Sequence, residues 1–127
     1  MAEEEKANIL VVDDLPDKLM ALETVLDELG QNVVVARSGR EAIEIVKRDP
    51  DIDIVLMDIM MPEMDGMATM KEIRKLPQGK NLPMVAVTAK AMKGDREKCI
   101  EAGAWDYLSK PVDRLHMLSV LRGWLHR

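Results

Sequence analysis

Short apolar runs alternate with helical patterns along this chain, and this alternation constrains its fold more than any other feature. The runs predict five strands, over residues 9–12, 33–36, 52–57, 84–87 and 107–109. The segments between and after them repeat apolar residues at the spacing of one helix face. Strands that alternate with helices pair in parallel, with helices on both faces of the sheet.

Start and stop signals predict where the helices lie. Gly30 follows the first helix as a predicted C-cap, and Ser38 forms a capping-box pair with Glu41 that opens the second. The fourth helix is predicted over residues 95–102. The last helix is predicted to be amphipathic, with an apolar face made by Leu115, Leu118, Leu121, Trp124 and Leu125. Five such units predict an α/β fold: a flavodoxin-like, doubly wound parallel sheet of five strands in the order 2-1-3-4-5, with five helices.

Length and charge limit the classes of protein that fit. The chain has 127 residues, which suits one domain, predicted over residues 8–127 after a flexible acidic tail over residues 1–7. The net charge of −5 argues against direct nucleic-acid binding, which requires a basic face. Cys99 is the only cysteine, and the start of the chain lacks the pattern of a signal peptide. No apolar run is long enough to span a membrane, so we expect no membrane contact and a cytoplasmic location.

Polar residues fall at the carboxyl ends of four predicted strands. Asp13 and Asp14 follow the first strand, Asp58 the third, Thr88 the fourth and Lys110 the fifth. Doubly wound sheets bind ligands at this edge, where the strand order reverses, and the first and third strands are neighbours there. Each residue alone would pass for a helix cap, a turn residue or a solvated side chain. Five of them at matching strand ends favour a joint site.

The residue types of this predicted site indicate phosphoryl chemistry. Three carboxylates close together repel one another unless a cation lies between them, and hard oxygen ligands suit Mg²⁺, for which Mn²⁺ can substitute. A lysine ammonium and a threonine hydroxyl can bind phosphate oxygens. One carboxylate, Asp58, can then act as a nucleophile and form an acyl phosphate, while the metal neutralises the phosphate oxygens.

The chain resembles the receiver domains of two-component response regulators in "ILVVDD", "LMDIMMPEMDG", "VAVTAK" and "GAWDYLSKPVD". Within that family it looks most like the receivers of hybrid histidine kinases. The resemblance implies that Asp58 accepts a phosphoryl group from a histidine kinase or a histidine phosphotransfer domain. It also implies the roles of the remaining site residues, which are the Mg²⁺ ligands Asp13, Asp14 and the Met60 backbone carbonyl, the switch residues Thr88 and Tyr107, the charge partner Lys110, and Pro111, with a cis bond to Lys110.

Three further expectations concern other residues, and the first and the last of them come from the resemblance. Met60 and Lys90 lie two residues after Asp58 and Thr88 respectively, and our hypothesis is that they help to set the lifetime of the phosphate. Trp105 is either an ordinary partly exposed side chain or an anchor for a partner. An exposed apolar subset, for docking the phosphodonor, is expected among Leu15, Pro16, Leu19 and Met20.

Two other functions remain open from the sequence. A haloacid-dehalogenase-type phosphatase also uses an Asp nucleophile, Mg²⁺ and Lys, but its Asp-x-Asp motif is missing here, because Asp58 is followed by Ile59 and Met60. A binding module of flavodoxin-like fold without phosphotransfer is the other alternative. A receiver of this kind is a signalling domain rather than an enzyme, apart from slow self-dephosphorylation. It could be a stand-alone protein or a domain of a larger kinase.

Overall fold

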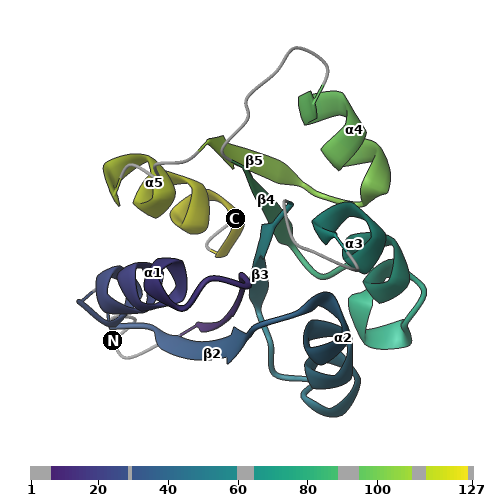
Figure 1. Ribbon diagram of the computed structural model, residues 1–127, viewed down its shortest axis with the longest axis horizontal. Helices are drawn as coiled ribbons and strands as arrows, with labels where there is room; N and C mark the ends of the chain where they lie inside the picture. The colour runs from purple at the N-terminus through teal and green to yellow at the C-terminus, as the bar shows by residue number, and fades with distance from the viewer. Residues whose placement is uncertain (1–6, 29, 60–64, 89–94, 110–113, 126–127) are drawn as a thin grey trace.

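A computed structural model describes residues 7–28, 30–59, 65–88, 95–109 and 114–125 (Figure 1). Five parallel strands form one sheet in the order β2-β1-β3-β4-β5, which confirms the predicted topology. The strands are β1 (Asn8–Val12), β2 (Asn32–Ala36), β3 (Ile54–Asp58), β4 (Met84–Thr88) and β5 (Asp106–Ser109). The helices are α1 (Pro16–Glu28), α2 (Gly39–Arg48), α3 (Gly66–Arg74), α4 (Asp95–Ala102) and α5 (Arg114–Leu125), with a short 3₁₀ turn, η2 (Pro77–Gly79).

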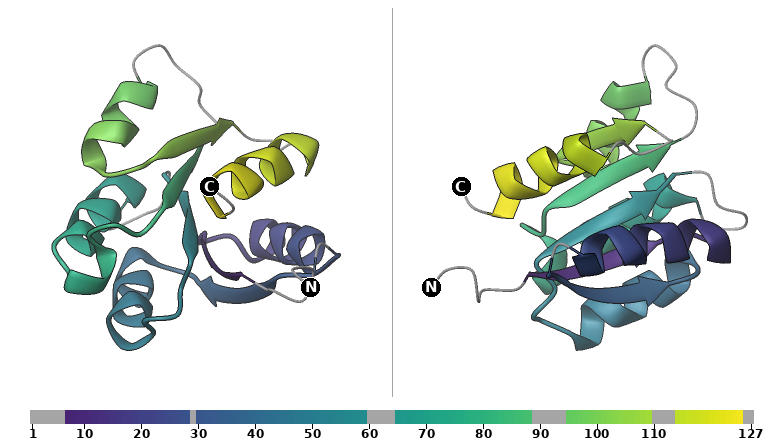
Figure 2. Two further views of the ribbon diagram at one scale, coloured as in Figure 1. Left: turned by 180° about the vertical axis from the view of Figure 1, so that it is seen from behind. Right: turned by 90° about the vertical axis from the view of Figure 1, so that its left-hand side faces the viewer.

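Side chains that alternate along the strands divide the core into two clusters. Leu10, Val55 and Met57 face one cluster, with α2, α3 and α4 packed over it. Ile9 and Leu56 face the other cluster, which α1 and α5 cover. The two layers of helices are visible on opposite sides of the sheet (Figures 1 and 2). The sheet is therefore buried on both faces, as its continuous apolar strands predict.

Local signals in the sequence explain the ends of the first two helices. Gly30 adopts a φ of 78° after α1, and the backbone N–H groups of Gly30 and Gln31 donate to the carbonyls of Asp27 and Leu26. This is the Schellman arrangement, which glycine makes without steric cost. The Ser38 hydroxyl accepts from the Glu41 N–H at 3.1 Å.

The predicted capping box at α2 is confirmed only in its first half. The Glu41 carboxylate accepts from the N–H of Arg37 at 2.7 Å, one residue before the N-cap Ser38. The third strand also begins at Ile54 rather than at Ile52, because Ile52 is buried but precedes the paired residues of the sheet.

The predicted apolar face of the last helix is wrong at Leu115, whose side chain is 74% exposed. Leu121 is buried as predicted, and the residue buried in place of Leu115 is Met117, with Val120 packed beside them. Two residues turn a helix by about 200°, so Leu115 points away from the side that carries Met117. The side chains of Leu118, Trp124 and Leu125 lie outside the described part. In the described part of the chain, no helix has the length and hydropathy needed to cross a bilayer.

Candidate functional site

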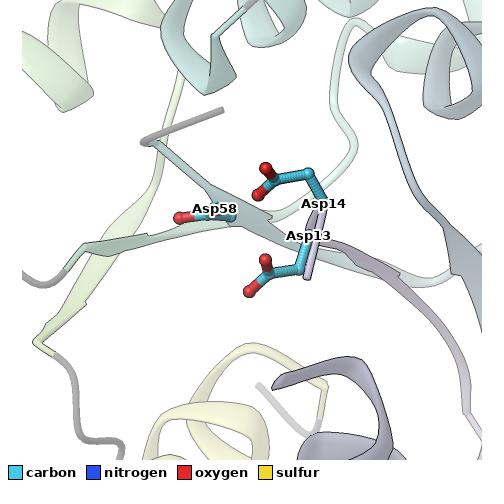
Figure 3. Close-up of side chains that lie close together, drawn as sticks. All are labelled: Asp13, Asp14 and Asp58. Carbon is cyan, nitrogen blue, oxygen red and sulfur yellow. The ribbon is translucent and has the colours of Figure 1, made fainter. Parts of the chain in front are cut away.

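Three carboxylates come together at the carboxyl edge of the sheet. Asp13 and Asp14 follow β1, Asp58 ends β3, and one oxygen from each lies within 4.8 Å of the others. Figure 3 shows the carboxylates of Asp13, Asp14 and Asp58 gathered in one place, with Asp13 and Asp14 coming from the chain just after β1. The predicted convergence of the three acids is therefore present in the structure.

The sheet register places this cluster. Val12 of β1 pairs with Met57 of β3, and this is the last pair between the two strands. The residues that follow, Asp13 and Asp58, therefore lie side by side. The N–H of Asp13 donates to the carbonyl of Ala36 at 3.1 Å, which fixes the exit from β1. One carboxylate oxygen of Asp13 accepts from the N–H of Leu15 at 3.1 Å and turns the chain into α1.

Burial makes the cluster costly without a counter-charge. The exposed fractions of Asp13 and Asp58 are 1% and 3%, and Asp14 is half-buried. Ionised carboxylates are expensive to bury unless they are paired or bind a metal. Two oxygens on opposite sides of Mg²⁺ lie about 4.2 Å apart, since each Mg–O bond is about 2.1 Å. The donor type and the spacing of these oxygens therefore fit one hard cation.

Thr88 and Tyr107 lie on the two strands beyond Asp58. Asp58 pairs with Val87, so Thr88, the last residue of β4, lies one residue beyond Asp58 at the carboxyl end of the sheet. The side chain of Thr88 is buried. Tyr107 pairs with Ala86 and is half-buried against the core cluster under α2, α3 and α4. Alternation along β4 puts Thr88 on the same face of the sheet as Ala86, and therefore on the face of Tyr107.

Four of the residues singled out in the sequence lie outside the described part of the chain. They are Met60, Lys90, Lys110 and Pro111. The carbonyl ligand, the charge partner and the cis bond therefore stay predictions.

Gly66 has a role that the sequence analysis did not find. A β-carbon at this position would lie 2.2 Å from the backbone oxygen of Asp58 and 2.8 Å from the Cα of Ile59. The N–H of Gly66 donates to the Ile59 carbonyl at 3.2 Å, and the Asp65 side chain caps α3 through the N–H of Ala68 at 2.8 Å. Gly66 therefore lets the start of α3 press against the strand end that carries Asp58. The Asp-Gly pair before a helical pattern was its only signal.

Exposed apolar side chains lie near the acidic cluster. Leu15 and Met20 of the α1 region are 49% and 66% exposed, whereas Leu19 is buried in the core. Pro16 is exposed as well, so the expected exposed subset is present in Leu15, Pro16 and Met20. Leu115, which is also exposed, belongs to α5, and α5 lies on the same side of the sheet as α1 (Figure 1).

Trp105 belongs to the opposite edge of the sheet, just before β5. Its backbone N–H donates to the Met84 carbonyl at 2.7 Å, and the Arg74 guanidinium lies 5.6 Å from the centre of its ring. Arg74 also donates to the carbonyls of Gly79 and Leu82, at 2.6 Å each, and to that of Gly103. Burial lowers the pKa of Arg74 from its usual value. These contacts give Trp105 a structural role away from the acidic cluster.

Comparison with known proteins identifies the family. The model of the response regulator receiver domain matches residues 9–122. The histidine-protein kinase BarA of Escherichia coli K12 is 43% identical over 112 residues, which cover 87% of this chain and 12% of BarA. A receiver domain of the sensor histidine kinase PA1611 from Pseudomonas aeruginosa PAO1, solved with magnesium in its active-site cleft, superposes with a TM-score of 0.89 at 36% identity, covering 97% of this chain and all of that one.

A third relative was solved in a complex. The receiver domain of Saccharomyces cerevisiae Ssk1, crystallised with the phosphotransfer protein Ypd1, has a TM-score of 0.85 and 29% identity, covering 95% of this chain and 90% of that one. The chain belongs to the response regulator receiver domain family. Its similarity to the receivers of hybrid histidine kinases is confirmed as well. The chain spans about an eighth of the length of BarA.

Proposed function

We propose that this domain is the phospho-accepting receiver of a two-component phosphorelay, with Asp58 as the acceptor. The convergence of Asp13, Asp14 and Asp58 at the reversal point of the sheet carries this proposal. A carboxylate oxygen of Asp58 attacks the phosphorus of a phosphohistidine. The new P–O bond forms as the P–N bond breaks, and the electron pair of that bond returns to the imidazole.

The acids around Asp58 prepare the site for this transfer. Asp13, Asp14 and Asp58, together with the Met60 carbonyl, would hold Mg²⁺ or, in its place, Mn²⁺. The ion supplies positive charge that neutralises the phosphoryl oxygens. The Asp13 side chain is held by the N–H of Leu15 and Asp58 by the pairing of β3, so both carboxylates are oriented in advance.

Phosphorylation then shifts a conformational equilibrium. Phosphorylation replaces the Asp58 carboxylate with a group of about −2 charge beside Thr88, whose hydroxyl turns toward the phosphoryl group while Lys110 pairs with it. Tyr107 shares the sheet face of Thr88 and responds to that turn. A group that makes these contacts in one state alone favours that state, and partners read the shift.

The phosphodonor is a histidine kinase or a histidine phosphotransfer domain, as the Ypd1 complex of the Ssk1 receiver suggests by analogy. Leu15 and Met20 give it an apolar docking area next to the acidic cluster. We assign the receiver to residues 8–127 after a tail over residues 1–7. We also propose that it works in the cytoplasm, without contact to nucleic acid or membrane.

One experiment tests the acceptor. The protein is incubated with Mg²⁺ and acetyl phosphate and then weighed by mass spectrometry. We expect a single phosphoryl adduct, absent in Asp58→Asn and retained in the control Asp51→Asn, which changes an exposed acid away from the site. An unchanged adduct in Asp58→Asn contradicts the proposal. Repeated turnover of unrelated phosphate esters would instead favour the haloacid-dehalogenase alternative, which the family match does not support.

A further inference from the structure

A groove lies between α1 and the start of β2, which is the outermost strand of the sheet on that side. It is an open depression with a volume of about 450 Å³. We call it the α1–β2 groove. It is lined on one side by the helix and on the other by the edge strand, through Met20, Glu23, Thr24, Asp27, Asn32 and Val33.

The outer edge of β2 has hydrogen-bonding groups to offer. The N–H of Asn32 donates to the Ala7 carbonyl, and the Ala36 carbonyl accepts from Asp13, so these two residues face β1. Because the N–H and C=O of one residue point to the same side and alternate along a strand, those of Val33 and Val35 point outward. Within the described part of the chain, no strand pairs with that side.

Nothing in the sequence of β2 protects this edge. Natural proteins guard exposed edges with lysine, proline or inward charges, and the strand reads NVVVA. Val33 and Val35 are only half-buried against the core. The edge is therefore suited to receive one more strand from outside, the arrangement known as β-strand addition.

Charge determines which strand would fit. Glu23 and Asp27 line the groove, and no ion pair to either is found among the described residues. The last turn of α1 contains no basic residue, although the carbonyl end of a helix favours positive charge. A second copy of this chain would bring the same acids, and its own start, MAEEEK, would bring three more.

We propose that the α1–β2 groove binds an extended basic segment of a partner protein, which adds to the outer edge of β2. Its backbone pairs with the outward groups of Val33 and Val35. Its apolar side chains pack on Met20, and its lysines or arginines meet Glu23 and Asp27. The proposal does not rest on the function proposed for Asp58, although Met20 belongs both to this groove and to the exposed apolar area beside the acidic cluster.

The test uses a blocked seven-residue peptide of alternating lysine and valine as the probe, titrated into the full chain and followed by amide NMR. We expect saturable shifts and slower amide exchange at Val33 and Val35. A matched peptide with glutamate in place of lysine should bind at least tenfold more weakly. The double variant Glu23→Gln/Asp27→Asn should lose most of the affinity for the lysine peptide, whereas Glu97→Gln, an exposed acid on α4, should not.

Val35→Pro removes one outward donor and leaves the bonds to β1 intact, so it should fold and bind at least tenfold more weakly than Val35→Ala. If it does not fold, amide exchange at Val33 and Val35 in the unaltered chain decides the question. Equal binding of both peptides, shifts that avoid β2, or self-association through β2 without peptide would each overturn the proposal.

Discussion

The carbonyl oxygen of Asp58 and the Cα of Gly66 lie so close together that a single methyl group at residue 66 would stand 2.2 Å from that oxygen. Strand β3 and the start of α3 are therefore in direct backbone contact. A change at Gly66 must move either the helix or the strand end that carries Asp58. This contact leads to the first prediction.

Gly66→Ala should slow phosphorylation of Asp58 from acetyl phosphate by about tenfold to a hundredfold, since displacing a reacting group by about 1 Å can cost about a hundredfold in rate. It should also destabilise the domain by about 1–3 kcal/mol, as overpacked positions do. Adduct formation timed by mass spectrometry and urea unfolding check the two effects.

Gly123→Ala is the matched control for Gly66. Gly123 lies in α5, and no atom lies within 4 Å of a β-carbon placed there. Alanine should stabilise this helix by about 0.5–1 kcal/mol and leave the phosphorylation rate unchanged. Equal behaviour of the two variants would show that the close approach at Asp58 has no functional consequence.

Mg²⁺ should stabilise the domain through the acidic cluster. At a concentration a hundred times the dissociation constant, a single site adds about 2.7 kcal/mol to the free energy of unfolding. Asp14→Asn removes one charge of the cluster and should weaken binding at least tenfold. Thermal unfolding with increasing MgCl₂ measures both, and EDTA should return the wild type to its starting melting temperature.

The control for the metal prediction is Asp53→Asn, which also removes an acid close to β3 but at the opposite end of the strand. Asp53 accepts from the N–H of Asn8 at 2.8 Å, and asparagine keeps an acceptor oxygen there. Its melting temperature should rise with Mg²⁺ as in the wild type. A loss of the magnesium effect in Asp53→Asn but not in Asp14→Asn would place the site elsewhere.

Thr88→Val should separate phosphorylation from its response. Valine has the shape of threonine without the hydroxyl, so Asp58 should still gain the phosphoryl adduct. Changes in amide exchange around β5 and α4 on phosphorylation should be largely lost, while Thr88→Ser should keep them. A full response in Thr88→Val would remove the hydroxyl from the switch.

Arg74→Lys should destabilise the domain by about 1.5–3 kcal/mol, the range for hydrogen bonds made by charged groups. A lysine cannot reach the carbonyls of Gly79, Leu82 and Gly103 together, because it lacks the planar fork of arginine. Tryptophan fluorescence checks the local effect, because the guanidinium of Arg74 lies over the ring of Trp105 and its loss should change the emission. The control Arg48→Lys changes an exposed arginine at the end of α2 and should alter neither stability nor emission.

The sequence predicts those parts of the fold and site that depend on local pattern. Apolar runs, caps and strand-end acids are local, so the sheet order and the convergence of Asp13 and Asp58 follow from them. Leu115 was misplaced because the pattern of the last helix offers more than one apolar stripe, and only packing into the core cluster on the α1 side of the sheet selects the stripe with Met117. Residue 66 must be glycine because two backbone segments touch there, and a contact of this kind leaves no pattern in the sequence.

The same limit applies to Arg74 and to the α1–β2 groove. Arg74 reads as an ordinary charged residue at a helix end, yet it donates to three carbonyls from two separate segments of the chain, those of Gly79 and Leu82 before β4 and that of Gly103 after α4. Val33 and Val35 read as core residues, and only the position of β2 at the edge of the sheet leaves them half-buried.

The residues of the site are divided between the two faces of the sheet. Asp58 continues the series of Ile54 and Leu56, on the face that α1 and α5 cover, while Thr88 and Tyr107 belong to the face of α4. In the function proposed above, the phosphodonor therefore approaches from the side of α1, and the partner that responds to phosphorylation binds on the side of α4. Surface substitutions on one side should then change the choice of donor with little effect on the partner that binds the other side.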